Sequence, residues 1–98
     1  MSLPIVFRRV ARAEFDKAAD WYNDRQIGLG AMFVAAVEEV LGHIAAQPDF
    51  YPEVFQDVRE ALVAGYPYCV YFRGEPEQVL ILSIFHTARN PLEWQTRA

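Results

Sequence analysis

Apolar residues recur at helical spacing through much of the first half of the chain. Between residues 10 and 25 they return every three or four positions, and charged side chains occupy the opposite face. A second apolar series with the same spacing runs from residue 29 to residue 44. Pro48 ends it, because a proline ring clashes with the preceding helical turn. The Ile-Gly-Leu-Gly segment at 27–30 separates the two series. We therefore expect two helices that pack as an antiparallel hairpin.

Elsewhere in the chain the periodicity is that of strands. Short segments rich in β-branched and aromatic residues predict strands at residues 3–7, 58–63, 68–73 and 79–85. The last three are joined by short turns, which forces antiparallel neighbours because a parallel pair needs a crossover of about a dozen residues. The final strand is apolar on both faces except at Ser83, so we expect it to lie in the centre of the sheet.

These elements predict an α+β domain with the order β-α-α-β-β-β. We expect an antiparallel twisted sheet with the N-terminal helical hairpin packed on one face, and a short turn or helix at residues 90–94. A chain of 98 residues is enough for one compact domain, so residues 1–98 are expected to form a single unit. Hydrophobic residues make up 53% of the chain and charged residues 22%, which excludes an intrinsically disordered protein.

The cysteine content and the longest apolar run indicate the cellular compartment in which we expect the protein. The single cysteine, Cys69, cannot form an internal disulfide and suits a reducing cytoplasm. The longest uninterrupted apolar stretch, residues 31–37, is far shorter than the roughly 20 residues that a membrane-spanning helix needs. We therefore expect a cytoplasmic protein with no membrane partner.

The distribution of charge argues against general nucleic-acid binding. The chain has 9 basic and 13 acidic residues, which gives a net charge of −4. Residues 28–57 carry acids but no base, and the chain has no basic stripe of the kind that neutralises successive phosphates. We expect no stable DNA binding by the protein alone, although a few converging arginines could still form a local anion site.

Two arginines in the predicted strands are candidate functional residues. Arg59 lies inside a strand between apolar neighbours, where its side chain must face solvent, a partner or a buried acid. An ordinary charge on an edge strand would explain it equally well. Arg73 ends a strand just before a turn, where solvated charges are common.

His86 and Arg89 form a second candidate group. His86 directly follows the most apolar strand, and an imidazole at such a position can act as an acid or a base near neutral pH. It could instead only donate a hydrogen bond to a loop carbonyl. Arg89 could hold an anion beside it, because the guanidinium fork matches phosphate oxygens, or it could pin the C-terminal turn.

The residue types exclude the common metal and cofactor motifs. Two histidines and one cysteine at these spacings do not make a metal site, and no phosphate-binding glycine motif or nucleophile elbow occurs. We expect no metal and no cofactor. Several aromatic residues fit core or hairpin packing, but any that stay exposed would mark a protein-binding surface. The aromatic residues for which both outcomes are open are Trp21, Tyr22, Phe50, Tyr51 and Phe55.

The last forty residues resemble the RelE/ParE toxin superfamily. The resemblance rests on Val-Arg-Glu-Ala-Leu at 58–62, Tyr-Pro-Tyr-Cys-Val-Tyr-Phe-Arg at 66–73, and the strand from residue 79 that runs into His-Thr-Ala-Arg-Asn-Pro-Leu-Glu-Trp at 86–94. The β-α-α-β-β-β order extends it over the whole chain. Proteins of this type are often called plasmid stabilisation proteins.

The resemblance implies the toxin of a type II toxin–antitoxin pair, which a cognate antitoxin neutralises. RelE-like members cleave messenger RNA on the ribosome, and ParE-like members inhibit DNA gyrase. For RNA cleavage, the resemblance would assign catalytic roles to Arg59, Arg73, His86 and Arg89, with Tyr71 as a stacking or acid group. The resemblance also implies that Tyr71 and Trp94 belong to a surface that binds a partner protein.

Departures from the RelE-like pattern favour a ParE-like, noncatalytic toxin. The lysine-rich strand of the nucleases is absent, Ser83 stands where many relatives carry an arginine, and the acidic isoelectric point weakens docking onto ribosomal RNA. The alternatives are a ribosome-dependent mRNA endoribonuclease and a nontoxic remnant that survives as a binding module. The nuclease hypothesis requires Arg59, His86 and Arg89 to converge within about 4–8 Å of one another.

Overall fold

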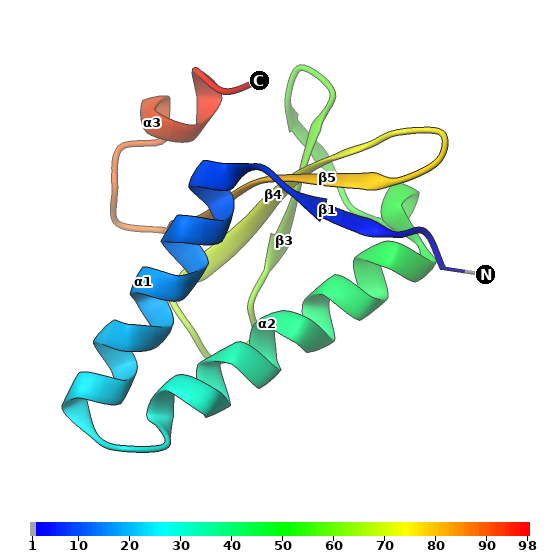
Figure 1. Ribbon diagram of the computed structural model, residues 1–98. Coiled ribbons are helices and arrows are strands. Elements are labelled where there is room, and N and C mark those ends of the chain that lie inside the picture. The colour runs from blue at the N-terminus through cyan, green and yellow to red at the C-terminus, as the bar shows by residue number, and fades with distance from the viewer. Residues whose placement is uncertain (1) are drawn as a thin grey trace.

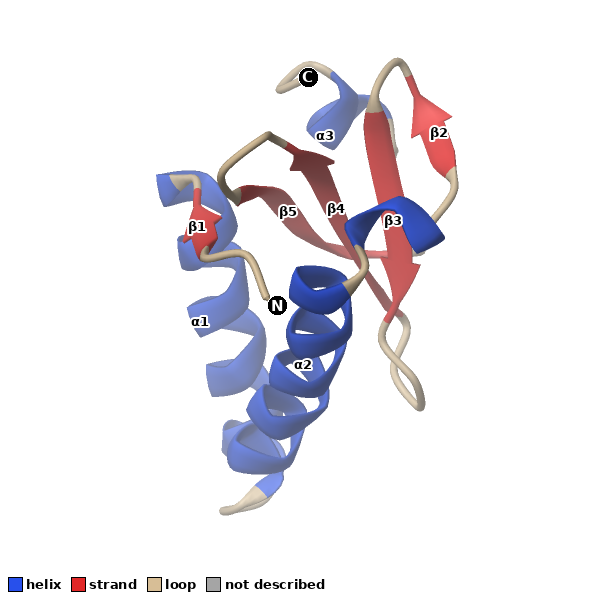
Figure 2. Cartoon of the chain, turned by 90° about the vertical axis from the view of Figure 1, so that its right-hand side faces the viewer, coloured by secondary structure: helices blue, strands red, loops and turns tan. Residues whose placement is uncertain are grey.

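The computed structural model describes residues 2–98 as a five-stranded sheet with helices on both of its faces (Figures 1 and 2). The α+β class and the N-terminal helical hairpin are confirmed, but the sheet has one more strand, Glu53–Phe55, than the sequence predicts. The elements are β1 (Ile5–Phe7), α1 (Arg9–Arg25), α2 (Leu29–Ala46), the 3₁₀ helix η1 (Pro48–Phe50), β2 (Glu53–Phe55), β3 (Val58–Leu62), β4 (Tyr68–Gly74), β5 (Val79–His86) and α3 (Leu92–Gln95).

The sheet is mixed, whereas the sequence predicts a wholly antiparallel one. Its strand order is β1-β5-β4-β3-β2. The antiparallel pairing of β3 with β4 and of β4 with β5 is confirmed, and β5 lies inside the sheet as expected. The difference is β1, which pairs parallel to β5. Because most of the chain, including the helical hairpin, separates the two strands, no short turn constrains their relative direction.

The two long helices form the predicted hairpin, which covers one face of the sheet (Figure 2). By length and composition α2 would suffice to cross a membrane, with a hydropathy of 1.5 over Leu29–Ala46. In this fold its apolar stripe builds the core instead. Phe33, Val37 and Ile44 are fully buried against sheet residues such as Phe72.

The helices of the hairpin approach each other closely at Gly30. A Cβ atom at this position would lie 2.7 Å from the Ala19 carbonyl oxygen and 3.0 Å from the Asn23 Cβ, both on α1. We expect Gly30→Ala to lower the free energy of unfolding by about 1–3 kcal/mol, because the helices must move apart. Gly42, also on α2, has open space around it, so Gly42→Ala is expected to raise stability by about 0.5–1 kcal/mol. Urea unfolding of both variants tests this, and equal effects would contradict it.

The other face of the sheet carries a smaller apolar cluster, which α3 covers (Figure 1). Trp94 of α3 is 3% exposed, and its ring stacks on Tyr71 of β4 at 3.9 Å between centroids. Phe55 contacts the same indole edge-on. The short C-terminal helix is thus held to the sheet chiefly by one aromatic side chain.

A buried ion pair covers the edge of β5 beyond the end of β1. Glu14 of α1 and Arg97 near the C-terminus form a bidentate pair, with side chains only 13% and 18% exposed. Arg97 donates to the Leu82 carbonyl, while a Glu14 oxygen accepts from the Ile84 amide and the Ser83 hydroxyl. The pair therefore supplies hydrogen-bond partners that a neighbouring strand would otherwise give.

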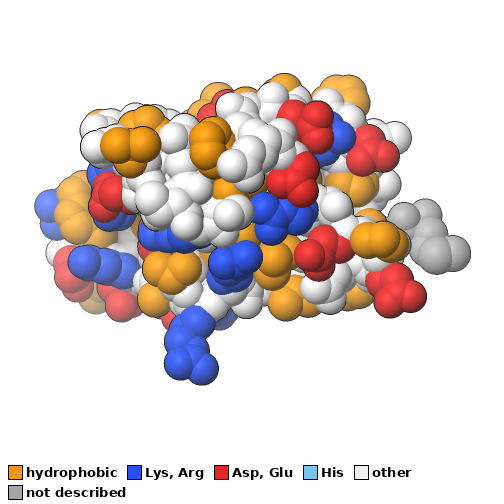
Figure 3. Space-filling view, turned by 90° about the horizontal axis from the view of Figure 1, so that it is seen from above, with side chains coloured by type: hydrophobic (Ala, Val, Ile, Leu, Met, Phe, Trp, Pro, Cys, Tyr) orange, Lys and Arg blue, Asp and Glu red, His pale blue; other side chains and the backbone are white. Residues whose placement is uncertain are grey.

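Side chains of both signs occur on the face seen from above in Figure 3, with apolar side chains between them. Surface ion pairs such as Arg12–Asp16 and Arg73–Asp57 also neutralise part of the positive charge locally.

Candidate functional site

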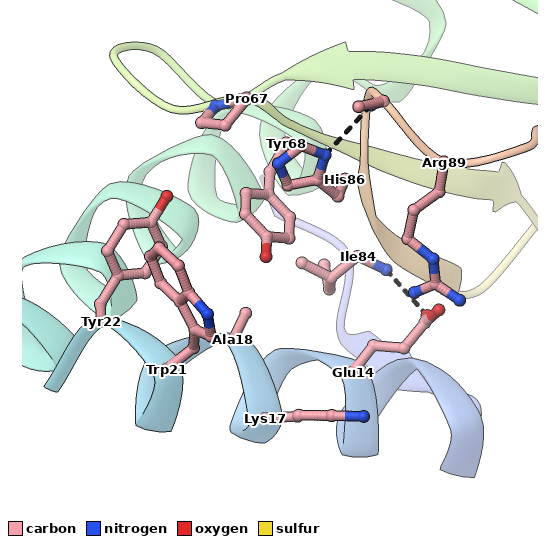
Figure 4. A pocket seen from close by; sticks show the side chains of 11 residues that line it. Glu14, Lys17, Ala18, Trp21, Tyr22, Pro67, Tyr68, Ile84, His86 and Arg89 are labelled. Atoms are coloured by element: carbon pink, nitrogen blue, oxygen red, sulfur yellow. Dashed lines mark hydrogen bonds between the residues drawn. The ribbon is translucent and has the colours of Figure 1, made fainter. Parts of the chain in front are cut away.

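A pocket of about 530 Å³ opens between α1 and the ends of β4 and β5 (Figure 4). Helix α1 supplies residues at i, i+3/i+4 and i+7/i+8, which lie on one face because of the helical repeat. The strand ends and the loop after β5 supply the opposite wall. The lining residues are Glu14, Lys17, Ala18, Trp21, Tyr22, Pro67, Tyr68, Ile84, His86, Ala88 and Arg89.

His86 and Tyr68 lie side by side in this wall. They are register partners on β5 and β4, and their rings meet edge-to-face at 5.1 Å. His86 Nδ1 accepts a hydrogen bond from the Ala88 amide, so the neutral ring carries its proton on Nε2. The Tyr68 hydroxyl is directed toward α1 (Figure 4). Burial and then the neighbouring Tyr22 raise the pKa of Tyr68 above its usual value, so it stays a protonated donor at neutral pH.

The charged side chains of the pocket differ in whether other residues of the protein already bind them. The Glu14 carboxylate is held by Arg97 and Ser83. Arg89 donates two hydrogen bonds to Glu93, at 2.6 and 3.2 Å, and these are the main reason that its pKa is raised. Within residues 2–98, Lys17 takes part in no ion pair or hydrogen bond. It is therefore the pocket's uncommitted cation.

Arg59 belongs to a different part of the molecule. It donates to the backbone carbonyls of Asp49 and Tyr51, and its guanidinium lies 3.8 Å from the carboxylates of Asp49 and Glu53. These contacts fasten η1 and β2 to β3. The structure thus shows no buried acid beside Arg59: its own side chain is 21% exposed, but Asp49 and Glu53 are 92% and 52% exposed, and the arginine chiefly holds the adjoining loop through backbone carbonyls.

Arg59 and His86 lie far apart along the sheet. Arg59 pairs with Phe72 of β4, whereas His86 pairs with Tyr68, four positions away along that strand. At about 3.3 Å per residue this is roughly 13 Å along β4, and the two residues are also on strands separated by β4. The pocket therefore contains His86 and Arg89 but not Arg59.

Arg73 and the Tyr71–Trp94 pair lie outside the pocket. Arg73 binds Asp57 at 2.9 Å. The Tyr71 hydroxyl donates to Glu60 at 2.7 Å, and burial and then this hydrogen bond raise the pKa of Tyr71 far above its usual value. With α3 in place, Tyr71 and Trp94 are 7% and 3% exposed, so a partner could reach them only after α3 moved. Their partner-binding role stays a prediction.

The sequence interpretation did not single out the helical wall of the pocket. The sequence does not mark Lys17 as a candidate, and it predicts a packing role for Trp21 unless that ring is exposed; the Trp21 side chain is in fact 50% exposed. The sequence does indicate that Lys17 and Trp21 share one face of a helix, because they are four residues apart. The sequence does not show that this face of α1 lies opposite His86, because that depends on how the helix packs against the sheet. Among residues 2–98 no group of three or more His, Cys, Asp or Glu side chains could hold a metal ion.

The chain resembles known proteins in its fold and in a family sequence pattern. No curated protein matches the chain in sequence. Among solved structures, a chain of the "Chromosomal ParDE TA system from P. aeruginosa" has a TM-score of 0.76 at 19% identity, covering 87% of this chain and 96% of that chain. That likeness concerns the fold. In sequence, residues 5–91 match the family described as "ParE toxin of type II toxin-antitoxin system, parDE". The resemblance predicted from the motifs is confirmed: the chain belongs to the ParE toxin family, the toxins of type II toxin–antitoxin systems.

Proposed function

We propose that this toxin acts in the cytoplasm as a noncatalytic inhibitor of DNA gyrase and that a cognate antitoxin neutralises it. The observation that carries the proposal is the separation of Arg59 from His86 and Arg89. Arg59 pairs four positions further along β4 than His86 does, and its guanidinium is bound to the η1 and β2 segments. RNA cleavage through a 2′-hydroxyl needs a base, an acid and cations converging on one phosphate.

The remaining candidates are engaged in structural contacts. Arg73 donates through Nε to Asp57, and Arg89 donates through Nε and Nη2 to Glu93, so each guanidinium is already paired with a carboxylate with which a phosphate would have to compete. Tyr71 is a poor proton donor, because its pKa is raised and its hydroxyl is directed to Glu60. This arrangement supports binding of a target protein over catalysis.

The target is tested by inducing the protein alone in a bacterial host and following labelled thymidine and methionine incorporation over the first minutes. We expect thymidine incorporation to fall first, and co-expression of the antitoxin to restore it. Purified toxin is further expected to inhibit supercoiling by purified gyrase. An earlier fall in methionine incorporation would support the ribosome-dependent nuclease instead. No effect on either label, with the protein soluble, would identify a nontoxic remnant.

A variant of His86 separates the two activities. His86→Asn keeps an acceptor near the Nδ1 position for the Ala88 amide, but it removes the imidazole that the nuclease hypothesis needs as an acid or base. We expect the variant to inhibit thymidine incorporation within about threefold of the unaltered protein. A general acid–base contributes about 10²–10⁴-fold to a reaction, so a loss of toxicity on that scale, with antitoxin binding retained, would contradict the noncatalytic proposal.

A further inference from the structure

The surface around η1 and β2 exposes apolar side chains beside an open sheet edge. Strand β2 is last in the strand order, so its outer edge pairs with no strand among the described residues. The Phe50 ring of η1 is 78% exposed, and Val54 of β2 is 43% exposed. Residues 46–50 line a shallow hollow of about 390 Å³. An unpaired strand edge of this kind can accept the backbone of an extended segment from another protein.

Negative charge faces outwards around this edge. Asp49, Glu53 and Asp57 form ion pairs with two arginines, Arg59 and Arg73. All three acidic side chains are more than half exposed, whereas both arginines are about four-fifths buried. The arginines therefore lie beneath a surface on which carboxylate oxygens remain accessible. A partner that is complementary to this surface must bring positive charge.

The turn between β4 and β5 adds further acids at the same end of the molecule. Gly74 at the end of β4 lies against η1, because a Cβ atom built on it would be 3.8 Å from the Pro48 Cβ. Glu75 and Glu77 follow in the turn, and the exposed Glu77 side chain has no partner within residues 2–98. Figure 1 shows η1 and this turn at the right-hand end, where acidic and apolar side chains lie next to one another in Figure 3.

Arg59 fixes the position of η1 and β2. Its guanidinium donates to the backbone carbonyls of Asp49 and Tyr51, which fastens both segments to β3. The Tyr51 ring meets the buried Phe72 edge-on at 5.8 Å, and its neighbour Phe50 is left outside the core. The arginine that the sequence marks as a candidate functional residue thus holds the exposed ring in place.

Protection of the sheet edge against aggregation explains only part of this surface. Charged side chains and a short, irregular edge strand both prevent edge-to-edge pairing, and β2 has both features. Exposed Phe50 and Val54 would weaken such protection, because apolar side chains favour association. An apolar centre with a polar rim is the composition of a protein-binding surface.

We propose that the surface around η1 and β2 binds an extended, basic segment of the protein that the toxin inhibits, and that Arg59 is the positioning residue of this surface. The segment adds its backbone to the free edge of β2, places an apolar side chain against Phe50 and Val54, and binds the carboxylates with lysine or arginine side chains. The inference rests on the proposed function, which takes the inhibited protein to be DNA gyrase.

Removal of the exposed ring tests the apolar centre. Phe50→Ala is expected to raise the concentration of toxin that halves supercoiling by purified gyrase about tenfold or more. Its affinity for the antitoxin, measured by isothermal titration calorimetry, should stay within about twofold, and a parallel loss would assign the surface to the antitoxin instead. Ile27→Ala is the matched control, because Ile27 is 90% exposed and lies at the other end of α2 from η1. The control should keep supercoiling inhibition within about twofold of that of the unaltered protein.

Arg59 is tested with two substitutions of different severity. Arg59→Met removes both backbone contacts and should weaken supercoiling inhibition about tenfold or more, with antitoxin affinity unchanged. Arg59→Lys keeps a positively charged donor for the Tyr51 carbonyl and should restore most of the inhibition. A parallel loss of inhibition, antitoxin affinity and unfolding midpoint in urea would show that Arg59 only stabilises the fold, and would overturn its positioning role.

Carbodiimide cross-linking locates the contact directly. Lys17 is the only lysine of the toxin, so links to a partner's lysines form through the toxin's own carboxylates. Peptide mapping of the complex with gyrase is expected to find Asp49, Glu53 or Glu77 linked to the partner. Links at other acids alone would overturn the site.

Growth inhibition on induction in a bacterial host separates the inference from the proposed function. Phe50→Ala and Arg59→Met should both lose it, and growth inhibition equal to that of the unaltered protein would overturn the surface whatever the target is. Loss in the variants, combined with no effect of the unaltered toxin on gyrase, would keep the surface and overturn gyrase as the target. An unaltered toxin that does not slow growth would overturn both.

Discussion

Replacing Arg97 with methionine is expected to lower the free energy of unfolding by about 3 kcal/mol, because the change leaves the Glu14 carboxylate without its counter-charge in a largely buried place. It also leaves the Leu82 carbonyl without the Arg97 donor. The loss is large for a residue next to the C-terminus, where substitutions are usually tolerated. Urea unfolding followed by circular dichroism measures it.

An exposed ion pair on the same helix provides the matched control. The side chains of Arg12 and Asp16 are 59% and 62% exposed, so Arg12→Met should cost no more than about 0.5 kcal/mol. Adding Glu14→Gln to Arg97→Met should recover part of the loss, because a neutral amide leaves no uncompensated charge. Equal costs for Arg97→Met and Arg12→Met would disprove the structural role of the buried pair.

Trp94→Ala is the other substitution with a large expected effect. Removing the indole deletes the stacked contact with Tyr71 and opens a cavity beneath α3, which should cost about 3–5 kcal/mol. Loss of α3 docking should also expose the sheet face that carries Cys69, which is buried in the native protein. We expect the Cys69 thiol to react with an aromatic disulfide reagent markedly faster in the variant than in the unaltered protein.

Trp94→Phe separates ring packing from the polar part of the indole. The Trp94 Nε1 atom is buried and has no hydrogen-bond partner within the described residues, and an unsatisfied buried donor costs about 1–3 kcal/mol. Phenylalanine keeps an aromatic contact with Tyr71 and removes this donor, so its net cost should be well below that of alanine. If Trp94→Phe destabilises the protein as much as Trp94→Ala, a contact specific to the indole holds α3 in place.

The two substitutions bear on different faces of the molecule. Arg97 ties the C-terminus to α1 through Glu14, which also lines the pocket, while Trp94 covers the opposite face of the sheet.

The sequence alone determined the elements that rest on local chemistry. The apolar period in α1 and α2, the stop at Pro48 and the short turns between the last three strands are all properties of neighbouring residues. The central position of β5 also followed, because a strand that is apolar on both sides must be covered on both sides. The toxin family could be recognised for the same reason, since its motifs lie within these strands and the loop after β5.

Only the tertiary structure decided which distant residues meet. The parallel pairing of β1 with β5, the Glu14–Arg97 pair across 83 positions and the binding of Arg59 to η1 depend on how the elements pack. The nuclease hypothesis requires Arg59 to converge with His86 and Arg89, and the register of β4 separates Arg59 from the other two. Periodicity reports which face a side chain occupies but not what lies opposite it, because that depends on long-range packing. The pocket depends on such long-range packing, because it forms where one face of α1 lies against the ends of β4 and β5.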